Sequence, residues 1–191
     1  MSLLEEVEKY AKETLSEKRF SHSIGVMNMA EELAVLYGVD VEKAKICGLA
    51  HDIAKEMSKE EALAYVEENN IEIDEVEKIN TSLLHGKIGA DIAKKKFGFD
   101  EQMQKAIIYH TTTDPEMDML AKIVYVADKV EMGRQCEKYD VEAERELARK
   151  DIDEVILLII NLNIEHLIEK GRMIHPKSIQ TRNVLLLNKM V

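Results

Sequence analysis

The stretch Gly48-Leu49-Ala50-His51-Asp52-Ile53-Ala54-Lys55 places a histidine, a carboxylate and a lysine inside an apolar run. The apolar residues on both sides predict a buried helix. Burying an unpaired carboxylate is costly, so Asp52 needs a metal ion or another cation beside it. We therefore interpret His51 and Asp52 as the first two ligands of a metal site, with Lys55 near the same helical face.

The composition predicts a single all-helical domain. The 191 residues include only two prolines, eight glycines and no tryptophan, whereas Glu, Lys, Leu, Ile and Ala, which favour helices, are common. A chain of this length can bury most of its unfolded surface without disulfides as staples. The expected fold is therefore all-α, in one domain that spans residues 1–191.

Charge, cysteines and apolar runs restrict the partners and the location. The formal net charge of −11 argues against binding to nucleic acid, which needs a basic face. Cys47 and Cys136 show no paired spacing, and with no signal peptide they predict a reduced, cytoplasmic protein. The apolar run 155–160 is too short to span a membrane, and the run 184–187 is expected to be core or a homodimer face.

Capping residues and apolar spacing predict a series of helices. Asp40, Ser58 and Asp100 are expected to begin helices, and Gly38 and Gly98 to end them. The segment 16–21 is expected to interrupt the helical pattern. Helices are predicted over about residues 3–15, 22–37, 41–55, 59–69, 82–97, 101–110, 119–130 and 152–170, with others beginning near 141 and 176, and 71–79 is either a short helix or a packed loop.

Six polar side chains fall on otherwise apolar helical faces. A single helical histidine is more often a structural residue than a ligand, but four of the six histidines in this chain share the pattern with two aspartates. Imidazole and carboxylate without thiolate suit Fe, Mn, Mg or Zn. Six ligands are too many for one catalytic ion, so two ions that share Asp52 are expected. The six residues are His22, His51, Asp52, His85, His110 and Asp128.

These residues carry a resemblance. Their order resembles the ligand series of the HD-domain phosphohydrolases, an all-helical superfamily, and the two middle histidines resemble the subset with a dinuclear centre. More closely, six blocks resemble the YqeK family: Lys18–Ser23, Gly48–Lys55, Leu84–Ala90, Tyr109–Thr112, Val124–Glu131 and Met173–Pro176.

The resemblance implies a fold, an activity and a cofactor. It implies an HD core over about residues 18–131, with C-terminal helices in 141–190 packed on it. The implied reaction is the symmetrical hydrolysis of diadenosine tetraphosphate, a small-molecule nucleotide, to two ADP. The implied centre holds two metal ions, iron above all, with Mn, Mg, Co or Zn as alternatives.

The expected mechanism is metal-assisted hydrolysis of a phosphoanhydride. Two ions bridged by Asp52 would lower the pKa of a shared water, and the resulting hydroxide would attack phosphorus. Lys55 would stabilise the charge that develops on the phosphoryl oxygens, so it is counted with Asp52 as catalytic. One ion would be held by His22, His51, Asp52 and Asp128, and the other by Asp52, His85 and His110.

Several further residues are candidates for contact with the substrate, although each also has a simpler interpretation. Arg134 would be a solvated charge at a helix end, and Arg182 a surface charge. Thr111 and Thr112 would only terminate a helix, and a histidine before a proline suits a helix entry. The full set is Lys55, Lys87, Thr111, Thr112, Arg134, His175 and Arg182.

Two other functions keep the same site. One is an HD-type phosphohydrolase that acts on nucleotides or deoxynucleotides. The other is a sensor that binds a nucleotide without hydrolysing it, which the complete ligand set argues against. Cyclic-dinucleotide phosphodiesterases are set aside, because the paired His-His-Glu and the Gly-Tyr-Pro that they need are absent from the sequence.

Overall fold

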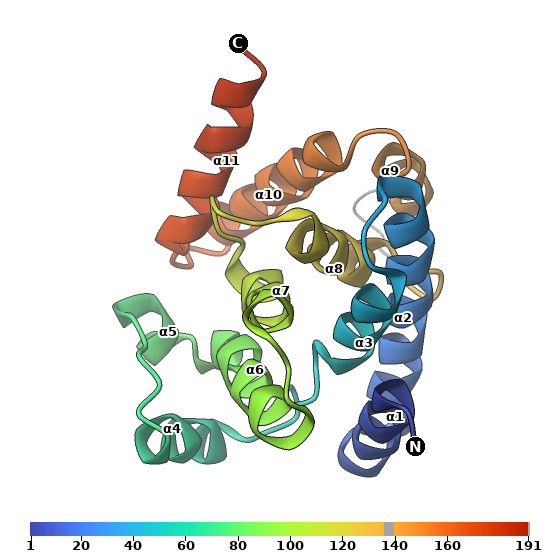
Figure 1. The fold of residues 1–191 in the computed structure, drawn as a ribbon. Coiled ribbons are helices and arrows are strands. Elements are labelled where there is room, and N and C mark those ends of the chain that lie inside the picture. Colours follow the sequence, from blue (N-terminus) through green and yellow to red (C-terminus); the bar gives the residue numbers. More distant parts are fainter. Residues whose placement is uncertain (136–139, 191) are drawn as a thin grey trace.

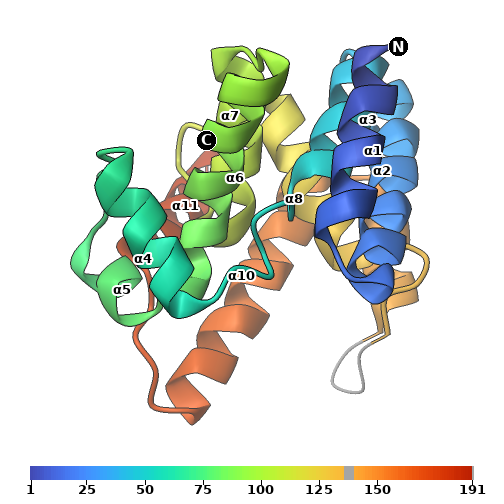
Figure 2. The same cartoon turned by 90° about the horizontal axis from the view of Figure 1, so that it is seen from below.

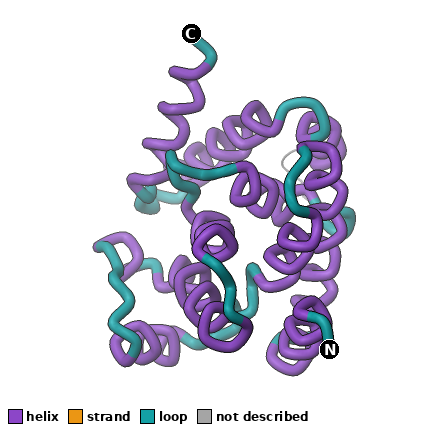
Figure 3. The backbone as a smooth tube through the Cα atoms, viewed as in Figure 1, coloured by secondary structure: helices purple, strands orange, loops and turns teal. Residues whose placement is uncertain are grey.

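The computed structural model describes residues 1–135 and 140–190. No strand occurs in this described part of the chain (Figure 3), so the all-α prediction is confirmed. A short 3-10 turn at Thr81–Leu83 precedes α6. The α-helices labelled in Figure 1 are α1 (Leu3–Thr14), α2 (Glu17–Tyr37), α3 (Val41–Ala50), α4 (Lys59–Glu68), α5 (Glu75–Ile79), α6 (Leu84–Phe97), α7 (Glu101–Thr112), α8 (Met119–Val130), α9 (Val141–Ala148), α10 (Ile152–Glu169) and α11 (Pro176–Asn188).

Helix α8 lies at the centre of the fold (Figure 1) and packs against α2, α3, α7, α9 and α10. Its sequence is apolar on nearly every side, and all of its residues except Met119, Lys122 and Lys129 are buried. The Asp118 carboxylate begins the helix by accepting a hydrogen bond from the Ala121 amide (2.9 Å). Asp128, in the last turn, is therefore fixed in the interior by the packing of α8.

Most helix boundaries follow the predicted capping residues. The side chains of Asp40, Ser58 and Asp100 each accept a hydrogen bond from an amide in the first turn of α3, α4 and α7. Gly38 and Gly98 end α2 and α6 with φ angles of 68° and 69°, a conformation that favours glycine. These boundaries are confirmed.

The prediction that residues 16–21 interrupt the helical pattern is wrong. Only Leu15 and Ser16 separate α1 from α2, because the Ser16 hydroxyl accepts a hydrogen bond from the Arg19 amide (3.3 Å) and caps α2. Ser16 is held in place by the Glu56 carboxylate, which accepts hydrogen bonds from its amide and its hydroxyl at 2.6 Å each. Arg19 and His22 consequently lie one turn apart on the same helix.

The prediction of one continuous helix through His51, Asp52 and Lys55 is also wrong. Helix α3 ends at Ala50, and the segment 51–56 forms successive turns. Tighter hydrogen bonds close these turns, from the Ile53 amide to the Ala50 carbonyl (3.2 Å) and from the Lys55 amide to the Asp52 carbonyl (2.9 Å). Both His51 and Asp52 are nevertheless buried, so the turns direct two consecutive side chains into the interior.

The remaining helices lie around α8 in separate groups. Figures 1 and 2 show α6 and α7 between the α1 to α3 group on one side and the α4 and α5 pair on the other. At the C-terminal end, α10 contacts α8, α9 and α11. The buried residues of one apolar core extend in sequence from Val7 to Leu185. In a smaller cluster, Ala62 and Val66 of α4 pack with Leu84 and Ile88 of α6.

Three further predictions concern single segments. Leu185 is buried and Leu187 is exposed, so the apolar run 184–187 is divided between the core and the surface. Cys47 is buried as predicted. Cys136 belongs to the segment 136–139, which lies outside the described residues. Within the described residues, no helix combines the length and the apolarity needed to cross a bilayer.

Candidate metal centre

The six predicted ligands meet at one place in the interior. His22 comes from α2, His85 from α6, His110 from α7 and Asp128 from α8, while His51 and Asp52 come from the turns after α3. The imidazole rings form a continuous row, with centroid distances of 5.3 Å for His22 and His51, 5.0 Å for His51 and His110, and 4.9 Å for His85 and His110.

Backbone carbonyls fix the orientation of three of the histidines. The Nδ1 atoms of His51, His85 and His110 lie 2.7, 2.5 and 2.5 Å from the carbonyl oxygen three residues earlier in the chain. A carbonyl can only accept a hydrogen bond, so each Nδ1 carries the proton. In the neutral form of each ring, Nε2 therefore presents a lone pair to the centre, which is the arrangement that a metal-ligating histidine requires.

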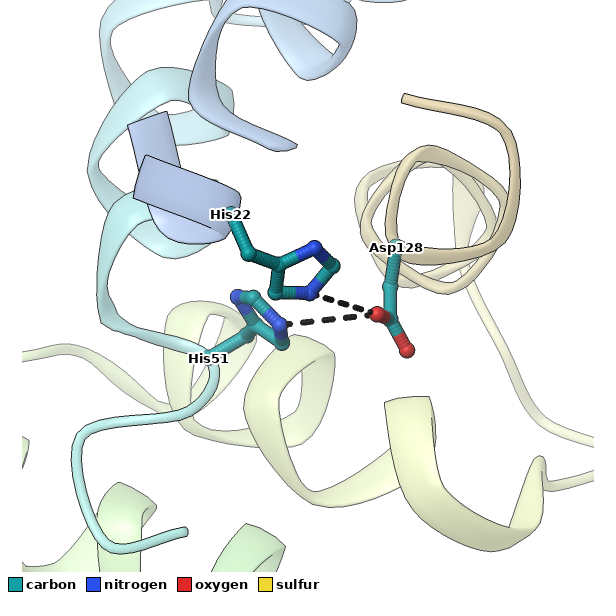
Figure 4. Close-up of side chains that lie close together, drawn as sticks. All are labelled: His22, His51 and Asp128. Carbon is teal, nitrogen blue, oxygen red and sulfur yellow. Dashed lines mark hydrogen bonds and ion pairs between the residues drawn. The ribbon is translucent and has the colours of Figure 1, made fainter. Parts of the chain in front are cut away.

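His22 is oriented by a side chain instead. Its Nδ1 donates to the Glu131 carboxylate (3.2 Å), and its Nε2 lies 3.0 Å from Asp128 Oδ1. Figure 4 shows that His22 and His51 both point at this oxygen, and the His51 Nε2 lies 3.6 Å from it. The role of Glu131 was not predicted, because it comes from a residue distant in sequence at the end of α8.

The two carboxylate oxygens of Asp52 face different histidines. Oδ1 lies 3.1 Å from His85 Nε2 and 3.5 Å from His110 Nε2. Oδ2 lies 3.4 Å from His51 Nε2 and 3.9 Å from His22 Nε2. Asp52 thus stands between two pairs of histidines, one on each side of its carboxylate.

The surroundings favour the ionised form of both aspartates. Burial alone would raise the pKa of Asp52, but the histidines around it, His51 foremost, hold that pKa well below its ordinary value. The pKa of Asp128 is also well below its ordinary value, because Lys129 and the histidines outweigh the effect of burial. The centre therefore contains two negative charges that need positive charge beside them.

The histidines respond differently to the same environment. Burial lowers the pKa of His85, and it lowers the pKa of His110 to about 4, so both rings are neutral at pH 7. Burial also opposes a charge on His51, but the two aspartates outweigh it and raise the pKa of His51 to about 10. Either a proton on His51 or a metal ion would supply positive charge beside the two carboxylates. Metal binding would displace the proton, because neutral imidazole is the form that binds metal.

Three cations touch the carboxylates of the centre. Arg19 Nη1 lies 2.9 Å from Asp52 Oδ2, and Lys129 Nζ lies 2.5 Å from Asp128 Oδ2. Lys55 Nζ donates to His85 Nε2 (3.2 Å) and lies 3.9 Å from Asp52 Oδ1. Only Lys55 was predicted among these three. The position of Arg19, one turn before His22, was the signal that could have identified it.

The other predicted contact residues are divided between two regions. Arg134 lines a cavity of about 590 Å³ together with Lys18, Arg19 and His22, so it lies beside the centre. Thr111, Thr112 and His175 line a second cavity, of about 240 Å³.

Lys87 and Arg182 have other partners. Lys87 Nζ donates to the Glu77 carboxylate (2.6 Å) and to the Glu72 carbonyl (2.8 Å), and Arg182 Nε donates to the Asn161 side chain (2.6 Å). The structure does not bring either residue to the cluster.

The donor set fits a metal ion. Two groups of three ligand atoms, those of His22, His51 and Asp128 and those of His51, Asp52 and His110, each lie within 4.8 Å of one another. The buried His51 Nε2 has no hydrogen-bond partner in the described part of the structure. Nitrogen and oxygen donors without sulfur suit Fe, Mn, Mg or Zn.

Comparisons with known proteins agree with this fold and this cluster. The model of the HD domain family matches residues 19–133, a range that contains all six clustered residues. A crystal structure from Clostridium acetobutylicum, described as a predicted HD superfamily hydrolase involved in NAD metabolism, is 37% identical and superposes with a TM-score of 0.91 over 96% of this chain and 97% of that one. The all-helical fold and the converging histidines and aspartates thus place the chain in the class of HD-domain proteins.

Two relatives specify the group within that class. A protein of Halalkalibacterium halodurans is 36% identical over 92% of this chain and 92% of its own length, and one of Bacillus subtilis is 34% identical over 95% and 97%. Both are named symmetrical bis(5′-nucleosyl)-tetraphosphatase. The chain therefore belongs to the HD domain family, in the group of these relatives, and the family resemblance found in the sequence is confirmed.

Proposed function

We propose that this chain is a metal-dependent hydrolase that cleaves diadenosine tetraphosphate symmetrically to two ADP. The observation that carries the proposal is the complete cluster, in which His85 and His110 complete a second set of donors on the Oδ1 side of Asp52. The names of the full-length relatives support the substrate and the symmetry of cleavage.

The proposed centre holds two metal ions, with iron as the first candidate and Mn, Mg, Co or Zn as alternatives. His22, His51, Asp52 and Asp128 would hold one ion, and Asp52, His85 and His110 the other. When bound, the ions would supply Lewis acidity and a water of lowered pKa. The orientation of the imidazoles by carbonyls, and of His22 by Glu131, supports this assignment.

The cations of the chain would bind the phosphates. Lys55 and Arg19 already touch Asp52, and Arg134 lies in the cavity beside His22, so all three are within reach of a phosphate chain at the centre. Fixed positive charges stabilise the charge that develops on phosphoryl oxygens during transfer. Asp52 and Lys55 are proposed as catalytic residues, and Arg134 as a phosphate contact.

The remaining contact residues are proposed with different support. Thr111, Thr112 and His175 share one cavity, which supports a role in binding part of the nucleotide. To contact the substrate, Lys87 would first have to break its hydrogen bond to Glu77, and Arg182 its hydrogen bond to Asn161.

The domain limits, oligomer and location are proposed as well. One HD domain over residues 1–191, with its core at about 18–131 and the helices of 141–190 packed on it, agrees with the shared apolar core. A homodimer and a cytoplasmic location stay predictions from the sequence.

The test is an assay of the purified chain supplied with Fe²⁺ or Mn²⁺. Chromatography of the products should give only ADP, two molecules for each diadenosine tetraphosphate consumed, and Asp52→Asn should remove the activity. ATP with AMP as products would contradict symmetrical cleavage. Phosphate released from mononucleotides without cleavage of the dinucleotide would identify a nucleotide phosphohydrolase, and binding without turnover would identify a sensor.

A further inference from the structure

Glu144 on α9 is a buried carboxylate that the reaction described above does not use. Only 2% of the residue is exposed, and neither carboxylate oxygen has a hydrogen-bond partner in the described part of the structure. Buried carboxylates are normally paired, because an unpaired one is costly. Glu144 lines a cavity of about 150 Å³.

The neighbouring residue, Arg145, is a buried charge with hydrogen-bond partners, unlike Glu144. Arg145 is also buried, but its guanidinium donates to the Val130 carbonyl (2.8 Å), to the Glu131 carbonyl (3.1 Å) and to the Glu142 carboxylate. Arg145 therefore fixes the end of α8, whereas Glu144 holds nothing comparable. Burial raises the pKa of Glu144 to about 7, although Arg134 opposes the shift, so the site is a poor one for a charge without a ligand.

The cavity at Glu144 lies between the metal cluster and the cavity of about 240 Å³, which has both apolar and polar walls. Towards the cluster, it is lined by Lys129, which pairs with Asp128, and by Arg134, which also lines the cavity beside His22. On its other side, Thr111, Tyr125 and Asn163 line both this cavity and the cavity of about 240 Å³. The sequence of environments is thus cationic, then carboxylate, then partly apolar.

The cavity of about 240 Å³ suits a flat group that carries some polar atoms. Its apolar walls include Leu83, Ile160, Ile164, Leu167 and Met173, and threonine, asparagine, histidine and serine side chains line the rest. Together the two adjoining cavities reach the lower end of the range of about 300–1,000 Å³ that is typical of small-molecule sites.

We propose that Glu144 accepts hydrogen bonds from the ribose hydroxyls of a nucleotide whose phosphates contact Arg134 and whose base enters the cavity of about 240 Å³. A nucleotide presents phosphate, sugar and base in the same order in which the chain presents cations, carboxylate and partly apolar walls. A carboxylate has two acceptor oxygens for the two neighbouring hydroxyls of ribose, and Asp or Glu serves this purpose in dinucleotide-binding folds. The inference rests on the proposed function, since it names the sugar contact of the same substrate.

The test compares the binding of three ligands by calorimetry to the full chain loaded with Mn²⁺. The ligands are ADP, 2′,3′-dideoxy-ADP and pyrophosphate. In the wild type, ADP should bind about tenfold more tightly than the dideoxy analogue, because hydrogen bonds to a charged group are lost in the analogue. Glu144→Ala should weaken ADP by about the same factor and leave the dideoxy analogue and pyrophosphate unchanged.

Two variants control for folding and for charge. Glu144→Gln keeps the shape of the side chain and should give a smaller loss for ADP, and its circular dichroism and metal content should match the wild type. Glu146→Gln changes an exposed carboxylate on the same helix and should have no effect on any ligand.

The outcomes separate this inference from the proposed function. If Glu144→Ala lost affinity equally for all three ligands, Glu144 would act on the phosphate contacts through Arg134. That result would overturn the proposed ribose contact. Equal affinity of the wild type for ADP and its dideoxy analogue would overturn it too, even if the variants failed to fold. If the metal-loaded wild type bound pyrophosphate but no ADP, the proposed function itself would fail.

Discussion

The Nε2 atoms of His85 and His110 lie 3.0 Å apart and face each other. Each ring donates its Nδ1 proton to a backbone carbonyl, so two lone pairs meet at this short distance. The arrangement is unfavourable unless a cation lies between or beside the rings. Lys55 contacts His85 at 3.2 Å, and a metal ion bound by both imidazoles would serve the same purpose.

The first prediction concerns this pair. His110→Ala should remove one of the two proposed ions and lower kcat/KM by more than about 100-fold, since even residues that only support a ligand cost 10- to 100-fold. The metal content per chain, measured by mass spectrometry, should fall from about two to about one. Lys105→Ala, which changes an exposed side chain on the same helix, is the control. An unchanged metal content would argue against a second ion at His85 and His110.

The second prediction concerns the contact of α6 with α7 next to His85. A Cβ on Gly86 would lie 2.9 Å from Thr111 Cγ2 and 3.1 Å from the Ile108 carbonyl oxygen, so Gly86→Ala must push the helices apart. We expect a loss of about 1–3 kcal/mol in the free energy of unfolding, and a lower melting temperature by several degrees.

Gly89 on the same helix is the matched control. Its nearest neighbours would lie 3.6 Å from an added Cβ, which is ordinary contact. Gly89→Ala should leave the melting temperature unchanged or raise it, because alanine favours a helix more than glycine does. Equal effects at both positions would show that the spacing of α6 and α7 does not constrain Gly86.

The third prediction concerns Arg19, which binds Asp52 Oδ2 at 2.9 Å. Arg19→Ala should lower kcat/KM by about 10- to 100-fold, the usual cost of one hydrogen bond to a charged group, while the metal content stays the same. Arg19→Lys should recover only part of the activity, because lysine lacks the planar pair of donors. Full activity of Arg19→Ala would show that the ion pair only stabilises the fold.

The fourth prediction is a pH dependence of stability at Glu144. Its pKa is raised from 4.5 to about 7, by burial first and then by Asp140, against the opposing charge of Arg134. A carboxyl with a raised folded pKa stabilises the protein below pH 4.5 and loses that stabilisation as the pH rises through about 7. Wild-type stability should therefore fall relative to Glu144→Gln between these pH values, by roughly 1–3 kcal/mol.

Urea unfolding between pH 4.5 and pH 8.5 measures this difference. The cost of burying the glutamine amide is the same at every pH, so only the change in the difference reports the titration. A difference that stays constant with pH would contradict the prediction. Glu146→Gln, which removes an exposed carboxylate, should show that constant difference.

Much of the fold could be predicted because its signals are local. Helix α8 begins and ends at the predicted residues, since a cap at Asp118 and a continuous apolar run define it without reference to the rest of the chain. The same holds for the ends of α2 and α6 at Gly38 and Gly98. The convergence of the six polar residues is predicted from their burial on apolar segments and from the family resemblance.

The errors and omissions depend on contacts between distant segments. The start of α2 depends on Glu56, forty residues away, which holds Ser16 in its capping position. Glu131 meets His22 across 109 residues, and the position of Glu144 follows from the packing of α9 on α8. Lys87 is predicted as a phosphate contact, but on α6 its side chain reaches Glu77 instead, a residue of the distant helix α5.

The order of the clustered residues along the chain sets when the centre can form. His22 is the first and Asp128 the last, so the chain must be made at least as far as residue 128 before the donor set is complete. During synthesis His22 leaves the ribosome well before α8, and a chain made only as far as α7 lacks the Asp128 carboxylate. Docking of α8 is therefore the step that completes the donor set, because it alone brings Asp128 to His22 and His51.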